Sequence, residues 1–249
     1  MTGKRGSSGG EPLSASPEPV FSDEPRRRAQ PGVTRYGGMV IDHVAVLVPD
    51  AAVAAQELRE RHGLGSEQGP YLPFAGTRGY TVPLIPPAYI EILAIEDRVA
   101  AESSKSGRDA LACEAAGFGL LAWSVLVEDL EAISLRERIE IFDYTVPHGD
   151  GTLRGWRSVA RRDVTFPSPY PFFIDYPNNG DRLARWQAAY DRVGHTSAPI
   201  GFSELTISGS PDEVTAWLGP HDLPLRFVPG DEGLVEARIS TEAGEVVIP

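Results

Sequence analysis

The 249-residue chain has little cysteine, no long hydrophobic run and few basic residues, and each shortage excludes a class of protein. Its one cysteine, Cys113, excludes a disulfide framework and a zinc site built from several thiolates. No stretch approaches the ~18 apolar residues of a membrane span. Residues 1–10 lack the apolar segment of a secretory signal. We therefore expect a cytoplasmic protein with no membrane partner.

Acidic residues outnumber basic ones by 35 to 23, which gives a formal net charge of −12. Such an acidic protein repels phosphate backbones, so nucleic acid is not the expected partner. A small-molecule substrate or ligand remains, and both a monomer and a homodimer are compatible with this charge. The hydrophobic fraction, 41%, is ordinary for a globular protein.

The first 38 residues are rich in Gly, Pro and Ser and contain hardly any large apolar side chains. A segment of this kind cannot bury enough surface to offset its ordering entropy, so residues 1–38 are predicted to be a disordered tail. The dense apolar pattern begins at Met39 and predicts one ordered domain over residues 39–249.

The ordered part begins with a strand–helix–strand–strand pattern. Residues 39–48 form a long β-prone run that predicts a buried strand. Asp50 can cap the following helix, which Gly63 would end. Further strands are expected at 79–85 and 88–95, with another near 71–74.

A second copy of this pattern follows. The segment Val46-Leu-Val-Pro-Asp50 recurs as Val125-Leu-Val-Glu-Asp129, again before a helical segment at 130–139. The strand Ala88-Tyr-Ile-Glu-Ile-Leu93 matches Pro171-Phe-Phe-Ile-Asp-Tyr176, and residues 153–160 and 164–166 can supply the other strands. An offset of about 80 residues indicates an internal duplication.

A third, shorter unit closes the chain. Ser210-Pro-Asp-Glu213 is a capping box with proline at the first helical position. Strands are expected before it, at 202–207, and after it, at 233–240 and 245–248. The three modules are predicted to cover about 39–99, 119–178 and 200–249.

Three features together resemble the vicinal oxygen chelate superfamily: the signature Ile41-Asp-His-Val-Ala-Val-Leu-Val-Pro-Asp50, the strand Tyr89-Ile-Glu-Ile92, and their repetition. Leu153-Arg-Gly-Trp-Arg157 and Pro171-Phe-Phe-Ile-Asp175 resemble its glyoxalase-like domain branch. The resemblance implies an α+β fold, in which paired βαβββ modules form open curled sheets around a cleft. A third, partial module would follow at the C-terminus.

In metal-dependent members of the superfamily, each module gives ligands from its first and last strands. The resemblance thus implies His43 and Glu91 as ligands in the first module. In the second module Ala122 stands opposite His43, so one ligand is missing, and Asp175 is taken as the counterpart of Glu91. Imidazole nitrogen and carboxylate oxygen suit zinc, manganese, iron or nickel. Such a metal would act as a Lewis acid that stabilises an enolate.

Other cleft residues are expected nearby. The resemblance implies that His195, after the second module, reaches the cleft as an acid or base. Arg154 and Trp156 could bind a carboxylate or a flat ligand, with Phe173 as pocket wall. Each residue also has a structural interpretation. His43 could be hydrogen-bonded to a neighbouring carbonyl or to Asp42. Glu91 could face solvent, Asp175 could lie in a turn, His195 could be a loop residue and Phe173 a core residue.

The first functional hypothesis is a metal-dependent lyase or isomerase that acts on a small oxygenated metabolite. The alternative is a metal-free protein of the same fold that binds or sequesters a small molecule, which the alanine at position 122 favours. A dioxygenase ranks third, because such enzymes usually need a second histidine that this alignment does not supply.

Overall fold

A computed structural model describes residues 38–148, 151–164, 166–177 and 179–249, so the predicted tail lies outside it except for Gly38. The described elements are, in chain order, β1 (Val40–Leu47), α1 (Ala51–His62), β2 (Glu67–Gln68), β3 (Thr77–Pro83), β4 (Tyr89–Ile95), α2 (Arg98–Ser103), α3 (Lys105–Ala115), β5 (Gly119–Leu126), α4 (Leu130–Glu137), β6 (Phe142–Pro147), β7 (Leu153–Val159), β8 (Phe172–Asp175), α5 (Asn179–Arg192), β9 (Pro199–Ser208), α6 (Pro211–Leu218), β10 (Leu225–Val228), β11 (Gly233–Thr241) and β12 (Gly244–Ile248). Among the described residues, no helix combines the length and the apolarity needed to cross a membrane.

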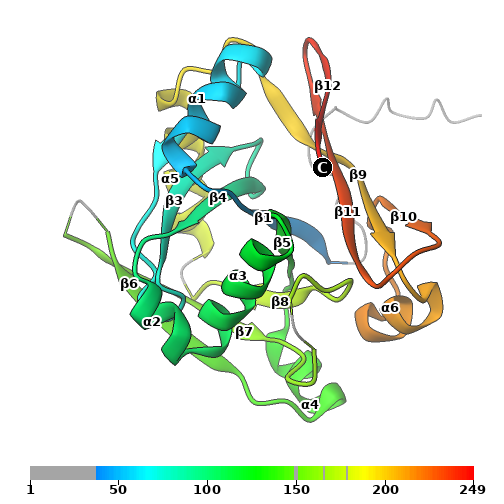
Figure 1. Ribbon diagram of the computed structural model, residues 1–249. Helices are drawn as coiled ribbons and strands as arrows, with labels where there is room; N and C mark the ends of the chain where they lie inside the picture. The colour runs from blue at the N-terminus through cyan, green and yellow to red at the C-terminus, as the bar shows by residue number, and fades with distance from the viewer. Residues whose placement is uncertain (1–37, 149–150, 165, 178) are drawn as a thin grey trace, which may run out of the picture. The chain divides into compact units, whose positions relative to one another are not determined.

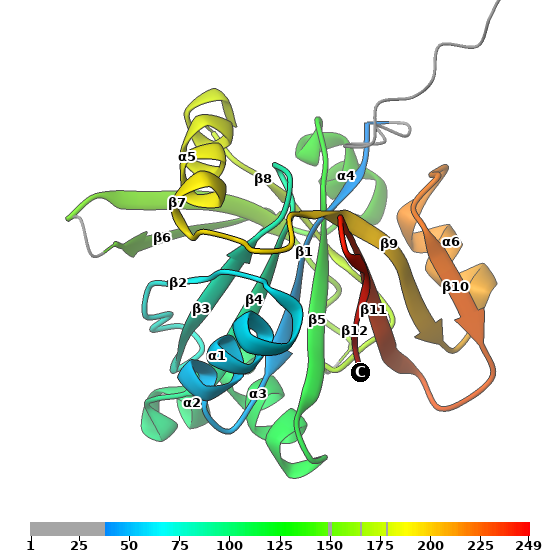
Figure 2. The ribbon, with the colours of Figure 1, turned by 90° about the horizontal axis from the view of Figure 1, so that it is seen from above.

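The first eight strands form one curled, open sheet in the order β2-β3-β4-β1-β5-β8-β7-β6 (Figures 1 and 2). Each half repeats the same pairing, since β1 pairs parallel with β4 as β5 does with β8. The halves meet where β1 and β5 run antiparallel, with His43 opposite Ser124 and Ala45 opposite Ala122. The sequence repeat aligns 43 with 122 and 45 with 124, so a two-fold rotation exchanges these two pairs. The predicted paired βαβββ modules are confirmed.

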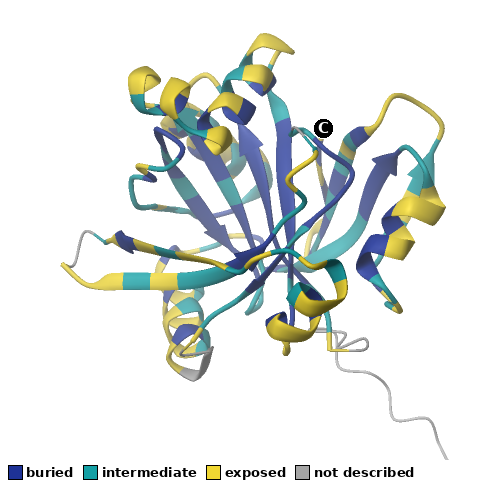
Figure 3. Cartoon of the chain, turned by 90° about the horizontal axis from the view of Figure 1, so that it is seen from below, coloured by how far each residue is buried: buried dark blue, intermediate teal, exposed yellow. Residues whose placement is uncertain are grey.

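Alternation along the central strands separates a packed outer face from a hollow inner face. Val44, Val46, Ile90 and Ile92 belong to the main apolar core, which also includes residues of α1, α4 and the second sheet. Their neighbours, His43, Ala45, Glu91 and Leu93, point to the opposite side. Figure 3 shows the central strands buried, while the outward sides of the helices are exposed. The inner face is therefore the side on which a ligand site can form.

Side-chain caps fix the ends of α1 in the way the sequence predicts. The Asp50 carboxylate accepts hydrogen bonds from the backbone N–H groups of Ala52 and Val53, at 2.9 and 3.1 Å. Gly63 ends the helix with φ 70°, a left-handed conformation that glycine adopts without strain. In the second module Asp129 caps α4, and Arg138 takes the left-handed position with φ 56°.

The last four strands form a separate sheet in the order β10-β9-β11-β12, with α6 beside it. The N-cap half of the predicted capping box is present, since Ser210 Oγ accepts a hydrogen bond from the Glu213 N–H at 3.4 Å, whereas the Glu213 carboxylate accepts one from the Tyr170 hydroxyl at 2.7 Å. Trp217 of α6 joins this unit to the large sheet. Its ring lies 5.1 Å from that of Phe173, and its Nε1 donates a hydrogen bond to the Pro171 carbonyl at 2.8 Å.

Two outer strands differ from the sequence-based prediction. The strand expected at 164–166 is instead β6, a partly exposed edge strand that lacks a clear apolar alternation. The strand expected near 71–74 is replaced by the short β2 and by a single bridge between Leu72 and Thr77. Edge strands carry weak hydrophobic patterns because only one side of the ladder is paired.

We expect Trp217→Ala to lower the free energy of unfolding by about 3–5 kcal/mol, because it removes a ring only 5% exposed. Trp217→Phe keeps most of the apolar contact and should cost about 1–3 kcal/mol, through the unpaired carbonyl of Pro171. Urea unfolding measures both. Val235→Ala, on a 43%-exposed position of β11, is the control and should change stability by less than about 0.5 kcal/mol. Equal losses in all three variants would contradict this account.

Candidate functional site

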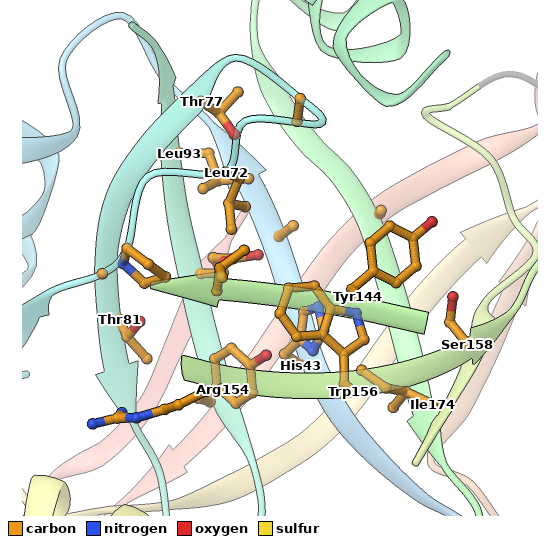
Figure 4. A pocket seen from close by; sticks show the side chains of 18 of the residues that line it. His43, Leu72, Thr77, Thr81, Leu93, Tyr144, Arg154, Trp156, Ser158 and Ile174 are labelled. Carbon is orange, nitrogen blue, oxygen red and sulfur yellow. The ribbon is translucent and has the colours of Figure 1, made fainter. Parts of the chain in front are cut away.

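A cavity of about 760 Å³ lies on the inner face of the large sheet. This volume is within the range of small-molecule sites. Side chains from both halves of the sheet point into it, as Figure 4 shows for His43, Thr81, Tyr144, Trp156 and Ile174. The loop before β3, together with α3 and α5, completes the wall.

A β-bulge places the central histidine. The pairing of β1 with β5 shifts between Ile41 and His43, so that Asp42 is an extra residue in the ladder. Bulges re-aim side chains, and here two successive residues meet. His43 Nδ1 lies 2.9 Å from Asp42 Oδ2. The imidazole ring stacks on Tyr89 at 4.5 Å and contacts the edge of Phe172 at 5.4 Å, which holds it against the cavity wall.

Asp42 is the centre of a buried polar group that we call the Asp42 cluster: Asp42, His43, Ser124, Tyr176 and Arg182. Asp42 is 0% exposed. Tyr176 donates its hydroxyl proton to Oδ2 at 2.9 Å, and Arg182 Nη2 donates to Oδ1 at 2.5 Å. Burial alone would raise the pKa of Asp42, but the charge of Arg182 and the bonds from His43 and Tyr176 outweigh it and lower the pKa. Asp42 is therefore an ionised carboxylate.

The ionised carboxylate determines which nitrogen of His43 can react. A carboxylate can only accept hydrogen bonds, so Nδ1 carries the proton and donates it to Asp42. The Ser124 hydroxyl lies 2.8 Å from the same nitrogen. No hydrogen bond engages Nε2 within the part of the chain that the structure describes, and the ring borders the cavity. Its lone pair is available to accept a proton from a bound molecule.

Glu91 lies one strand away on the same wall, where it pairs with Ala45. Burial raises the pKa of its carboxyl, an effect that His43 partly offsets. The group therefore keeps its proton to a higher pH than an exposed glutamate. Tyr89 is also on this wall, and burial raises the pKa of its phenol well above the usual value. The cavity thus holds one basic nitrogen beside two weak acids.

The predicted third metal ligand, Asp175, does not reach the cavity. In the first half Glu91 pairs with Ala45, and in the second half the position equivalent to Ala45, Ser124, pairs with Phe172. The counterpart of Glu91 is therefore Phe172. Asp175 accepts hydrogen bonds from Arg157, with Oδ1 2.9 Å from Nε and Oδ2 close to Nη2, and Arg157 also pairs with Glu131.

The donor set implied by the resemblance is consequently incomplete. The second half offers Ala122 and Phe172 where two ligands would stand, and neither side chain can coordinate a metal. No group of three or more His, Cys, Asp or Glu side chains that could hold a metal occurs among the described residues. Protein sites for transition metals typically use three or four side chains, so His43 and Glu91 alone do not fit such an ion.

The other predicted site residues divide into two groups. Arg154 and Trp156 of β7 line the cavity, and Trp156 stacks on Tyr144 at 5.3 Å and 11°. Phe173 is fully buried on the outer face, which corresponds to its structural interpretation. His195 is not part of the cavity wall. Its Nδ1 accepts the Gly65 N–H at 2.9 Å, and burial lowers its pKa, partly offset by the Pro83 carbonyl.

The sequence analysis named Asp42 as a possible partner of His43 but missed Tyr176 and Arg182. Asp42 and His43 are adjacent polar residues in an otherwise apolar run, which was a signal for a buried polar pair. Arg182 lies on α5, a helix that packs over the cavity from far along the chain (Figure 2). No spacing rule reveals that contact.

The duplicated βαβββ halves around a central cavity define a protein of the vicinal oxygen chelate superfamily. A family model described as a glyoxalase-like domain matches residues 41–221, and the chain belongs to that family. No curated protein matches the chain.

One solved structure supports the fold. A hypothetical protein from Staphylococcus aureus has a TM-score of 0.61 at 13% identity, over 85% of this chain and 99% of its own. The methylmalonyl-CoA epimerase from Mycobacterium tuberculosis has a TM-score of 0.40 at 18% identity, over 57% and 91%. That of Streptomyces coelicolor, in complex with 2-nitronate-propionyl-CoA, has a TM-score of 0.38 at 14% identity, over 55% and 96%. These likenesses concern the fold alone.

We expect Asp42→Asn and Arg182→Met each to lower the free energy of unfolding by about 3–5 kcal/mol, because each leaves its buried partner unpaired. The double variant should lose about 1–3 kcal/mol less than the sum. Urea unfolding tests this, with Arg78→Met in the more exposed Arg78–Glu96 pair as a control costing below about 1 kcal/mol. The cost of Asp42→Asn should begin to shrink as the pH falls below about 3.9, where the unfolded carboxyl takes up its proton. Additive losses would show that the pair is not coupled.

Glu91→Gln should have the opposite dependence on pH. Burial raises the folded pKa of Glu91, so wild-type stability is lost as the pH rises from the unfolded value, about 4.3, through the folded value. The glutamine variant lacks this loss and should gain stability relative to wild type between pH 4 and pH 7. Thermal unfolding at both pH values measures the gain, and exposed Glu57→Gln is the control. A gain that is independent of pH would contradict the assignment.

Proposed function

We propose that this protein is an enzyme of the isomerase or lyase type that moves a proton at a carbon atom of a small oxygenated metabolite, with Nε2 of His43 as the base. One observation carries the proposal. The buried Asp42 carboxylate binds the other ring nitrogen, and Nε2 has no hydrogen-bond partner in the described part of the chain, at the cavity wall. An imidazole nitrogen arranged in this way can accept a proton from a bound molecule and return it.

The residues of the cavity suggest how such a step would run. Nε2 of His43 accepts a proton from a carbon next to a carbonyl group, so that a C–H bond breaks and an N–H bond forms. The electron pair moves to the carbonyl oxygen as an enolate. Burial raises the pKa of Glu91, and its carboxyl, when protonated, would donate a hydrogen bond to this oxygen. Asp42 stabilises the imidazolium. Return of the proton to another carbon gives an isomerase, and loss of a leaving group gives a lyase.

The metal-dependent form of this activity, implied by the resemblance, would have only His43 and Glu91 as side-chain donors. The metal-independent form needs nothing beyond the Asp42 cluster and Glu91, and it is the one proposed here. A second candidate is a small-molecule-binding protein without turnover. The aromatic side chains in the cavity wall, among them Phe74, Tyr144 and Trp156, favour this candidate because they supply apolar contact without chemistry.

Hydrogen exchange at carbon tests the proposal without a known substrate. A panel of 2-oxo, 3-oxo and 2-hydroxy acids and simple ketones is incubated with the protein in D₂O and followed by proton NMR. We expect deuterium to enter at least one compound, and His43→Ala to slow this by about 10²–10⁴-fold, the usual contribution of an acid–base group. His62→Ala, at the end of α1, is the control and should keep the wild-type rate.

Two other outcomes decide between the candidates. Exchange that a chelator abolishes, and that added zinc or manganese restores, would support the metal-dependent form and overturn the one proposed. Compounds that bind the cavity but never exchange would favour the binding protein.

A further inference from the structure

Helix α5 contributes a basic wall to the cavity of a protein that is otherwise acidic. Arg182, Arg185, Trp186, Ala189 and Arg192 line the cavity, and their spacing of three or four residues puts them on one face of the helix. The α5 wall of the cavity therefore offers positive charge to a bound molecule.

Arg182 has hydrogen-bonding capacity to spare. Its side chain is 2% exposed, and the guanidinium lies 3.7 Å from the centre of the Tyr176 ring. Nη2 donates to Asp42 and, at 3.3 Å, to the Pro87 carbonyl, whereas Nε and Nη1 have no hydrogen-bond partner among the described residues. Buried N–H groups are almost always paired in folded proteins. Two unpaired donors on a buried cation at a cavity wall therefore point to an acceptor supplied by a ligand.

Two of the three α5 arginines of the wall are already paired with carboxylates, because Arg182 pairs with Asp42 and Arg192 pairs with Glu67, each at 2.5 Å. Asp109 of the wall pairs with Lys105 at 2.9 Å. Arg185 has no ion-pair partner among the described residues. The remaining charge near α5 is positive, and it would attract an anion and repel a cation.

The other walls are flat and apolar. Trp156 and Tyr144 stack on each other, with Phe74 against both. Across the cavity lining, Tyr89 lies between His43 and Trp186, with ring centres 4.5 Å apart on each side. Aromatic faces and edges favour planar ligands, with ring centres about 4.5–7 Å apart.

We propose that the cavity binds a flat, largely apolar carboxylate, with its anionic end at Arg182 and Arg185 and its planar body against the aromatic walls. Arg182 and His43 bind the two oxygens of the same Asp42 carboxylate. A ligand carboxylate at Arg182 would thus place its neighbouring carbons on the His43 side of the cavity. This inference rests on the proposed function, because it concerns the same cavity, and it adds the chemical class of the substrate.

Paired probes test the proposal. 2-Naphthoate and 2-naphthamide share a planar body and differ in charge, and isothermal titration calorimetry gives both affinities. We expect the carboxylate to bind at least tenfold more tightly. Arg185→Gln and Arg182→Lys should each reduce this preference several-fold, and the lysine variant keeps a cation beside Asp42 so that folding is preserved. Arg61→Gln, an exposed arginine of α1, removes the same charge from a distant surface and should leave the preference unchanged.

Equal affinity for the two probes, or no binding of either, would overturn the proposal. So would a preference that survives in both cavity variants. The proposed function fails in a different way. Preferential binding of 2-naphthoate without any His43-dependent exchange would support the proposed ligand class and contradict the proposed enzymatic activity. Exchange restricted to neutral ketones would support the enzymatic activity and contradict the ligand class.

Discussion

The interaction on which the site depends is the bond between one buried carboxylate and its three donors. Asp42 is fully shielded from water, a position in which an unpaired charge is very costly. Its partners come from separate parts of the chain: His43 from β1, Tyr176 from the end of β8 and Arg182 from α5. The same carboxylate therefore holds α5 against the sheet and sets the tautomer of the histidine. The Asp42 carboxylate thus contributes both to stability and to the proposed chemistry, so a substitution of Asp42 is expected to change both.

The duplication explains why the site is one-sided. Both halves of the large sheet have the same strand order, and the two central strands pair with the register that a two-fold axis requires. The inner-face positions nevertheless differ, since His43 and Glu91 correspond to Ala122 and Phe172. Replacing two polar positions with apolar ones converts half of the cavity from a donor set into a wall. In the proposed function, that wall would hold the body of a ligand while His43 and Glu91 contact its reactive end.

The sequence predicted those parts of the fold that follow a local rule. The caps at Asp50, Gly63 and Ser210 were found because each satisfies specific backbone groups. The resemblance implied His43 and Glu91, and the alternation of strand residues with a period of two explains why both face the cavity. Asp175 was misplaced because β8 has only four residues and is apolar on both faces, so its pattern does not specify register. The register of β8 is set by its pairing with β5, which is a tertiary contact that the local sequence does not specify.

The contacts of Asp42 and Arg182 could not be predicted, because they depend on departures from the regular strand and helix patterns. A period of two assigns Asp42 to the outer face, opposite His43. The bulge adds one residue to the ladder, so the side chains of Asp42 and His43 meet. A regular period of two does not predict this contact. Nothing in the local sequence distinguishes Arg182 from any other helical arginine of α5. Its burial depends on a carboxylate 140 residues earlier in the chain. The regular pattern accounts for the scaffold, whereas the reactive group arises where the ladder is irregular and a distant cation compensates for the buried charge. This follows from energetics, because an ionised carboxylate inside a sheet persists only where several elements converge to pair it.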